Sequence, residues 1–294
     1  PPAAVELCGS LADGTSVSGA AVAGQTPGVD LALRMPRACF LAKDHLNHKY
    51  GDKRALYLAV VLRTLRAHPA FAAAELGHAG AGGPAGARPV VTVPPSRALG
   101  LRGPLQIIPH AGHDGLARSK LLPSRSNLRA AGDGEAAPTP RYNNRVLEDI
   151  LMLSAADDVR ACVSSNPSLA EAMVLAKVWL MQRHLHRAPG GVSPFQLCLI
   201  LCHLQGTATL NAEMTPWQMV RAALLYLSHS RGVELQSAAS HPLRTAGAVM
   251  ARGTPKDDMA MSLAAFDVVL LDSSGQLNVL ASVSASGFAE LVWH

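Results

Sequence analysis

Three closely spaced helix starts in the second half of the chain constrain its fold more than any other feature. Each places Ser or Thr before an apolar run and Glu or Gln three residues later, at Ser168–Glu171, Ser193–Gln196 and Thr215–Gln218. In this pattern the hydroxyl accepts a hydrogen bond from a free backbone N–H, and the later side chain reaches back to the cap's own N–H. We therefore predict that helices dominate residues 141–294.

The first part of the chain has a mixed pattern. The runs "VDLAL", "PVVTV" and "PLQIIP" have the length and composition of strands, whereas Lys53–His68 is too long for a strand and suits an amphipathic helix. An earlier helix is expected over Arg145–Val163. The fold class predicted is therefore α+β, with an α/β domain at residues 1–128 and a mainly helical domain at residues 141–294.

Loop and turn residues divide these regions further. Residues 67–88 are rich in Ala and Gly and are expected to form a flexible insertion, and residues 129–140 are expected to form a linker or loop. Two β-rich runs flank Ser273–Gly275 and predict a strand pair near the end of the helical domain. Because the chain starts at Pro1 and stops inside an apolar run, we expect it to be part of a longer protein.

Composition narrows the function classes. Apolar residues make up 49% of the chain, which supports a packed core, and the net charge of +5 is compatible with an anionic partner such as RNA. No run reaches the roughly 18 apolar residues that span a bilayer, so we expect no membrane partner. The five cysteines form no CxxC pair and are expected to be reduced thiols in the nucleus or cytosol. No cluster of His or Cys residues has the spacing of a zinc site, and we therefore predict that the chain has no metal-binding site.

Gly9, Ser10 and Asp30 form the one pattern associated with a catalytic site. Template-independent nucleotidyltransferases place a Gly-Ser turn after their first strand, where it meets the triphosphate of the nucleotide. The next strand then carries two acids at positions i and i+2, which share one face and hold two divalent cations. A third carboxylate comes from a neighbouring strand.

This chain lacks the second and the third carboxylate of such a site. Ala32 occupies the i+2 position after Asp30, and the neighbouring strand "PLQIIP" offers Gln106 in place of an acid. A site that lacks two anionic ligands loses several kcal/mol of transition-state stabilisation. We therefore predict no catalytic residue and no cofactor, and expect Asp30 to accept hydrogen bonds at a strand end.

A basic set lies around Tyr50 and could track a phosphate backbone. The alternative is a solvated helix face on which Asp44 and Asp52 are local partners. The cations are Arg34, Arg37, Lys43, Lys49, Lys53 and Arg54. Of these, Arg34, Lys49, Lys53 and Arg54 are the predicted RNA contacts.

The order of motifs along the chain resembles the Nrap family of nucleolar RNA-associated proteins. The resemblance rests on "CGS", "GVDLALRMP", "KDHLNHKYGDKRALYLA", "RYNNRVLEDILM", "AKVWLMQR", "GGVSPFQLCLILCHL", "MTPWQMVRAALLYL" and "FDVVLLDSSGQLNVLASVSAS". It implies a nucleotidyltransferase-like domain followed by a helical domain like that of poly(A) polymerases and oligoadenylate synthetases, at the N-terminal portion of a longer protein.

The resemblance also implies a function. Members of this family are non-catalytic scaffold subunits of the nucleolar small-subunit processome, so the expected partners are precursor rRNA and other processome proteins, and the expected location is the nucleolus of the nucleus. Two alternatives remain open: a divergent metal-dependent nucleotidyltransferase acting on RNA ends, which would use Asp30, and an RNA-binding module without stable protein partners.

Overall fold

The computed structural model describes residues 1–17, 26–79, 88–112, 114–128, 137–229 and 256–293. Its sheet has five strands: β1 (Ala4–Cys8), β2 (Val29–Arg34), β3 (Glu75–Ala79), β4 (Arg88–Val93) and β5 (Leu105–His110). Their spatial order is β1-β2-β5-β4-β3. Only the β2–β5 pair among these five strands is parallel, whereas the other neighbours are antiparallel.

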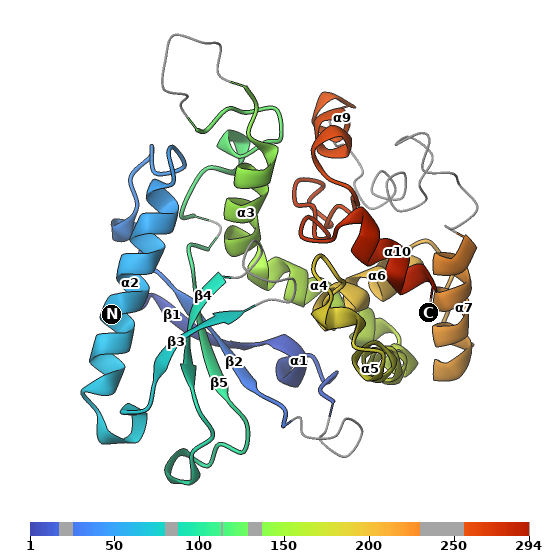
Figure 1. The fold of residues 1–294 in the computed structure, drawn as a ribbon, viewed down its shortest axis with the longest axis horizontal. Coiled ribbons are helices and arrows are strands. Elements are labelled where there is room, and N and C mark those ends of the chain that lie inside the picture. Colours follow the sequence, from blue (N-terminus) through green and yellow to red (C-terminus); the bar gives the residue numbers. More distant parts are fainter. Residues whose placement is uncertain (18–25, 80–87, 113, 129–136, 230–255, 294) are drawn as a thin grey trace.

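The helix α2 (Lys49–Arg66) covers one face of this sheet, and the later helices lie on the other side (Figure 1). Leu58 and Leu62 of α2 are four residues apart and pack against Leu33 of β2 and Ile107 of β5. Strand residues alternate between faces, so Asp30 and Ala32 lie on the face opposite α2. The predicted strands at "VDLAL", "PVVTV" and "PLQIIP" and the predicted helix after residue 53 are confirmed.

Helices follow from residue 140 onward, and most of them contribute to one large apolar core. The α-helices are α3 (Pro140–Ile150), α4 (Met152–Ser165), α5 (Pro167–Gln182), α6 (Pro194–Gly206), α7 (Pro216–His229), α9 (Lys256–Ala265) and α10 (Ala285–Trp293). A short helix, α1 (Gly9–Ala12), follows β1, and the 3-10 turns are η1 (Arg37–Cys39), η2 (Pro69–Phe71), η3 (Arg97–Leu99), η4 (Arg118–Lys120) and η5 (Leu185–Arg187). The core extends from Met35 and Phe40 to Leu291 in α10, so it joins both regions.

Two of the three predicted helix starts are confirmed. Ser193 and Gln196 exchange both hydrogen bonds of a capping box at α6. At α7 the Thr215 N–H donates to Gln218 Oε1 at 2.8 Å, and Gln218 N–H donates back to Thr215 Oγ1 at 3.4 Å. The start predicted at Ser168 is wrong, because α5 begins at Pro167, a residue whose fixed φ favours the first helical position.

Other predicted elements differ in the structure. The single helix expected over Arg145–Val163 is two helices, with a break at the buried Leu151. Within the expected insertion at 67–88, residues 75–79 are the edge strand β3, which pairs with β4 over its whole length. Residues 80–87, and residues 129–136 of the expected linker, lie outside the described residues.

The two runs predicted to pair around Ser273–Gly275 pair only briefly, through backbone hydrogen bonds from Asp272 N–H to the Leu277 oxygen and from Val279 N–H to the Leu270 oxygen, both at 2.9 Å. One antiparallel bridge joins Leu271 and Asn278, and the described residues of this segment form no strand. Two backbone N–H groups that would extend a β-ladder donate to side chains instead. The Asp272 carboxylate accepts from the Leu277 N–H at 3.1 Å, and the Asn278 amide oxygen accepts from the Leu270 N–H at 3.0 Å. Such local bonds compete with sheet formation.

Candidate functional site

Gly9 and Asp30 lie against each other where β1 leaves the sheet. Asp30 is opposite Cys8 in the antiparallel register of β1 and β2, and the chain turns at Gly9 with φ +73°. A Cβ on Gly9 would lie 2.3 Å from Asp30 Oδ2. Only glycine fits such an approach in this backbone conformation. The structure therefore brings together two residues of the predicted nucleotide site, and Ser10 follows in the first turn of α1.

The two positions that would supply further carboxylates, one on β2 and one on β5, carry none. Ala32, which shares the face of Asp30, is fully buried, and Gln106 of β5 is paired with Asp30 in the parallel register. The prediction that "PLQIIP" forms the strand beside β2 is thus confirmed, and the residue that this strand places opposite Asp30 is the amide Gln106. In the described part of the chain, no three His, Cys, Asp or Glu side chains are grouped so that they could hold a metal ion.

The first acid after this turn along the chain is used in another contact. Asp13 follows α1, is buried, and pairs with Arg160 of α4 at 3.1 Å. Two residues later, Thr15 accepts a hydrogen bond from Lys177 Nζ of α5 at 2.7 Å through its hydroxyl. These contacts fix the segment after Ser10 to the helices, and they occupy Asp13 with a cationic side chain.

Burial sets the electrostatics of the site. It raises the pKa of the Asp30 carboxyl, and burial together with the negative charge of Asp30 raises the pKa of the Cys8 thiol to about 12. The Cys8 thiol donates to the Asp30 backbone oxygen at 3.5 Å. No hydrogen bond to the Asp30 carboxylate is seen among the described residues, so its predicted role as an acceptor stays a prediction.

Replacing Asp30 with asparagine is expected to stabilise the protein at neutral pH. The folded state raises the pKa of this carboxyl, so its ionisation opposes folding above the ordinary Asp value of 3.8, and the penalty is complete above the raised value. The gain in unfolding free energy should therefore shrink as the pH falls towards 3.8. Urea denaturation at several pH values tests this, with exposed Glu6→Gln on β1 as the control. A less stable Asp30→Asn protein at neutral pH would contradict it.

The four predicted RNA contacts have different environments. Arg54 is buried and pairs with Asp149, so its prediction as an RNA contact is wrong. Arg34 pairs with Asp114 at 2.7 Å, and Lys53 pairs with Asp44 at 2.6 Å, which confirms Asp44 as a local partner. Lys49 is exposed at the start of α2.

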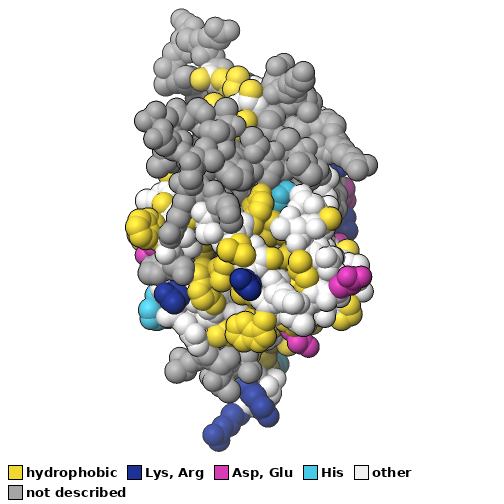
Figure 2. Space-filling view, turned by 90° about the vertical axis from the view of Figure 1, so that its right-hand side faces the viewer, with side chains coloured by type: hydrophobic (Ala, Val, Ile, Leu, Met, Phe, Trp, Pro, Cys, Tyr) yellow, Lys and Arg dark blue, Asp and Glu magenta, His cyan; other side chains and the backbone are white. Residues whose placement is uncertain are grey.

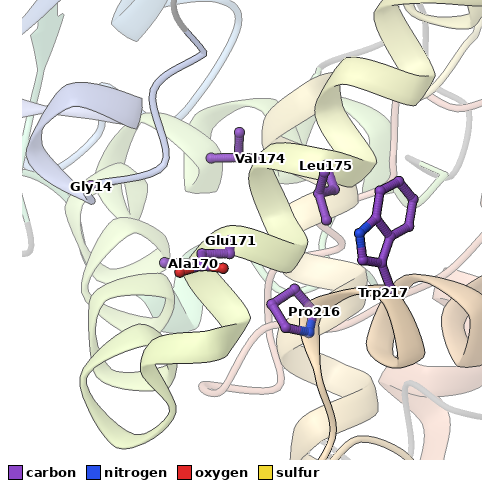
Figure 3. A pocket seen from close by; sticks show the side chains of 7 residues that line it. All are labelled: Gly14, Ala170, Glu171, Val174, Leu175, Pro216 and Trp217. Atoms are coloured by element: carbon purple, nitrogen blue, oxygen red, sulfur yellow. The ribbon is translucent and has the colours of Figure 1, made fainter. Parts of the chain in front are cut away.

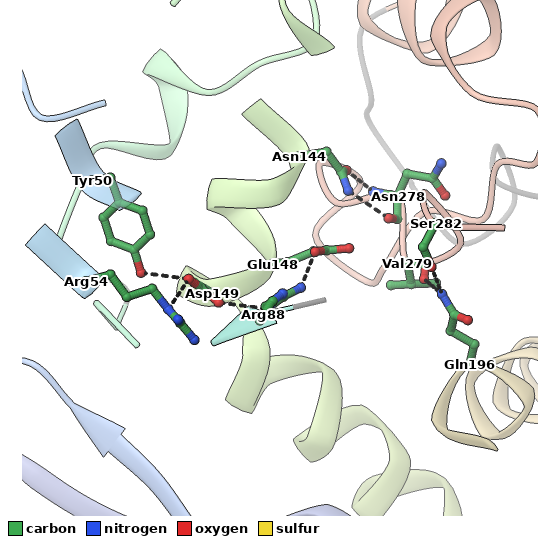
Figure 4. A network of polar contacts seen from close by, with 10 residues as sticks. All are labelled: Tyr50, Arg54, Arg88, Asn144, Glu148, Asp149, Gln196, Asn278, Val279 and Ser282. Atoms are coloured by element: carbon green, nitrogen blue, oxygen red, sulfur yellow. Dashed lines mark hydrogen bonds and ion pairs between the residues drawn. The ribbon is translucent and has the colours of Figure 1, made fainter. Parts of the chain in front are cut away.

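Tyr50, the aromatic expected among these cations, is also buried. It belongs to a polar network that sequence reasoning missed (Figure 4). Asp149 of α3 accepts from the Tyr50 hydroxyl at 3.1 Å and from Arg88 Nη1 at 2.7 Å, and pairs with Arg54 Nε at 2.8 Å. Arg88 of β4 also pairs with Glu148. Two adjacent acids within the apolar run "RVLEDILM" were the available signal, because charges on a buried helix need partners.

Two hollows border the helical part, and Asp30 lines neither of them. One is lined by Gly14 and by residues of α5 and α7, including Glu171 and Trp217 (Figure 3). The other runs between α7 and α10, where Trp217, Leu225 and Trp293 are exposed. Figure 2 shows hydrophobic side chains gathered on this side of the molecule. Exposed apolar surface of this kind is typical of contacts with other chains.

Within the described ranges, no helix combines the length and the apolar character needed to cross a bilayer.

Two family models match the chain in succession. The model described as Nrap protein domain 1 matches residues 1–165, and the model described as Nrap protein PAP/OAS-like domain matches residues 168–294. The two matches meet at the end of α4, so residues 141–165 fall within the first model.

Curated relatives match along almost the whole chain. Nucleolar protein 6 of Homo sapiens is 32% identical over 310 residues, which cover 99% of this chain and 25% of that protein. Nucleolar protein 6 of Xenopus tropicalis is 28% identical over 306 residues and is covered to 24%. The chain thus spans about a quarter of the length of these relatives.

A solved structure supports the fold assignment. The match is to a chain in the structure of the E. coli MS115-1 CdnC:HORMA-deltaN complex, with a TM-score of 0.52 and 16% identity, over 99% of this chain and 73% of that chain. CdnC has a nucleotidyltransferase fold. At this identity the similarity concerns the fold alone. The predicted α+β class, with a nucleotidyltransferase-like fold and a PAP/OAS-like domain, is confirmed.

Proposed function

The chain belongs to the Nrap family, and on that premise we propose that it is part of a non-catalytic scaffold subunit of the nucleolar small-subunit processome. In this role the protein acts in precursor rRNA processing and small ribosomal subunit assembly, and it is located in the nucleolus. The name of its relatives, nucleolar protein 6, supports the location. The proposed partners are precursor rRNA and other processome proteins.

The observation that carries the non-catalytic assignment is the strand register around Asp30. Two-metal nucleotidyl transfer needs several carboxylates to hold both cations. Here the i+2 position is Ala32, and the residue paired with Asp30 on β5 is Gln106. One buried carboxylate whose pKa is raised is a poor ligand for two divalent cations.

Recovery of partners tests the scaffold role. The full-length protein, immunoprecipitated from nuclear extract, should recover precursor rRNA together with small-subunit processome proteins. An otherwise intact precipitate that contains neither would overturn the proposal. Recovery of precursor rRNA without any of the proteins would favour an RNA-binding module that lacks stable protein partners.

A divergent nucleotidyltransferase acting on RNA ends is the second candidate. The close approach of Gly9 to Asp30 favours it, because this turn is where the family of enzymes meets the triphosphate. Incubation of the full-length protein with labelled nucleotides, an RNA primer and Mg²⁺ or Mn²⁺ decides between the two. We expect no incorporation. Incorporation that Asp30→Ala abolishes would establish the enzyme in place of the scaffold.

A further inference from the structure

One edge of the sheet gathers two loops that are far apart in the sequence. Because β2 and β5 are parallel neighbours, their carboxyl ends lie at the same edge, and the loops 35–48 and 111–128 both begin there. Figure 1 shows the first turn of α2 and the green segment before α3 on the same side of the molecule. In open α/β sheets, the crevice outside such strand ends is a common place for ligands.

Hydrogen bonds join the two loops into one surface. The Asn47 N–H donates to the Asn127 backbone oxygen at 2.9 Å, and the Asn127 amide donates to the Lys120 backbone oxygen at 2.7 Å. Arg34 at the end of β2 pairs with Asp114 in the second loop. Lys120 of the second loop lies near enough to His45 of the first loop for its positive charge to act there. Burial is the largest cause of the lowered pKa of His45, and this charge lowers it further.

The joined loops present a set of exposed cations, which we call the basic edge. Six exposed members of this set come from both loops and from the start of α2: Arg37, Lys43, Lys49, Arg118, Lys120 and Arg125. Of the acids nearby, Asp44 is buried against Lys53 and Asp114 is paired with Arg34, while Asp52 is exposed. The cations therefore outnumber the exposed acids, and the edge is complementary to a polyanion.

We propose that the basic edge binds the phosphate backbone of RNA, without reading its bases. RNA is chosen among polyanions because of the proposed nucleolar role, on which this inference rests. Among their described residues the two loops expose no Phe, Tyr or Trp ring for base stacking, since Phe40 and Tyr50 are buried and residues 111–128 contain none of these residue types. The exposed ring of His48 packs edge-on against Tyr142, at 5.0 Å between centroids. Contacts to phosphate alone are independent of sequence and strongly dependent on salt.

The basic edge is separate from the Asp30 site. Arg34 follows Asp30 by four residues of extended strand, or about 13 Å along β2. The Gly9 turn lies beside Asp30, in the first half of that strand. RNA bound at the basic edge would therefore not require any residue of the candidate nucleotide site.

Charge reversal on the full-length protein tests the proposal. The variant combines Lys49→Glu, Arg118→Glu and Lys120→Glu, and the probe is a fluorescent single-stranded RNA of about 20 nucleotides, long enough to span the several phosphates that such a surface contacts. We expect the affinity to fall at least about tenfold, and the slope of log K against log salt to become shallower by about 2 for three lost phosphate contacts.

A matched control carries the same change in net charge elsewhere. Arg63 on α2, and Arg97 and Arg102 in the loop that leads into β5, are exposed cations outside the basic edge. The last two lie near the amino end of β5, opposite the end that feeds the basic edge. Their triple reversal to Glu should leave RNA affinity within about twofold of wild type, because the Debye length is about 8 Å at physiological salt. Circular dichroism checks that both variants are folded.

The outcomes separate this inference from the proposed function. Loss of RNA binding in the first variant alone supports the basic edge. Equal losses in both variants, or wild-type binding in the first, overturn it. If the first variant keeps RNA binding but loses an acidic processome protein, the edge binds protein and the RNA assignment is wrong. If RNA binds at the edge but precipitates contain no processome component, the scaffold proposal fails while the RNA site stands.

Discussion

Replacing Asp149 with alanine is expected to lower the free energy of unfolding by about 3–5 kcal/mol, because it leaves charged partners without compensation inside the protein. Asp149 accepts from the Tyr50 hydroxyl, and it pairs with Arg54 and Arg88 at 2.8 and 2.7 Å. Arg54 is buried, and its Nη2 has no hydrogen-bond partner in the described structure, so it depends on Asp149 for charge compensation. Urea denaturation of the purified protein measures the effect.

An exposed ion pair provides the matched control. Asp157 pairs with Arg160 three residues later, and its side chain is 66% exposed. Such pairs contribute at most about 0.5 kcal/mol, so Asp157→Ala should change the unfolding free energy by no more than that. If Asp149→Ala and Asp157→Ala have equal, small effects, the contacts of Asp149 do not join α2, β4 and α3 as described.

A second large loss of stability is expected for Asn278→Ala. The Asn278 side chain accepts from the N–H groups of Leu270 and Leu280 at 3.0 and 3.1 Å, and it donates to the Val268 oxygen at 2.9 Å. All of these groups are buried, and each orphaned one costs about 1–3 kcal/mol. A loss of about 2–4 kcal/mol is expected in urea denaturation, because part of this cost is recovered by relaxation and water.

The control for Asn278 is a second asparagine that bonds to backbone at the surface. Asn211 is exposed, and its side chain accepts from the Glu213 N–H at 3.0 Å. Asn211→Ala should change stability by less than about 1 kcal/mol, since water replaces the lost partner. An Asn278→Ala loss no larger than the Asn211→Ala loss would show that the segment 267–283 does not depend on this amide.

Local patterns in the sequence predicted the parts of the fold that depend on near neighbours. The alternation of Val29, Leu31 and Leu33 with Asp30 and Ala32 correctly assigned the two faces of β2. The cap at Ser193 was correct because both partners lie within one helical turn. The placement of Ala32 and Gln106 beside Asp30 followed from the same alternation and from the identity of the neighbouring strand.

Contacts between distant segments were the main source of error. Arg54 looked like a surface cation, but its environment is set by Asp149, which also binds a tyrosine 99 residues away in sequence. The strand β3 was missed because its stability comes from pairing with β4 and its own residues include Gly77. Around Asn278, side-chain hydrogen bonds limit the ladder that β-rich composition predicted to a single bridge. None of these partners is encoded in local periodicity.

The most direct test of the proposed non-catalytic role replaces the endogenous full-length protein with an Asp30→Asn variant and measures precursor rRNA processing. The substitution keeps the shape of the side chain and removes the Asp30 carboxylate, and exposed Glu75→Gln on the edge strand β3 is the control. The proposed role predicts the same ratio of precursor to mature small-subunit rRNA as with wild type. Accumulation of precursor with a folded, normally abundant Asp30→Asn protein would contradict it, and would show that the carboxylate acts in processing.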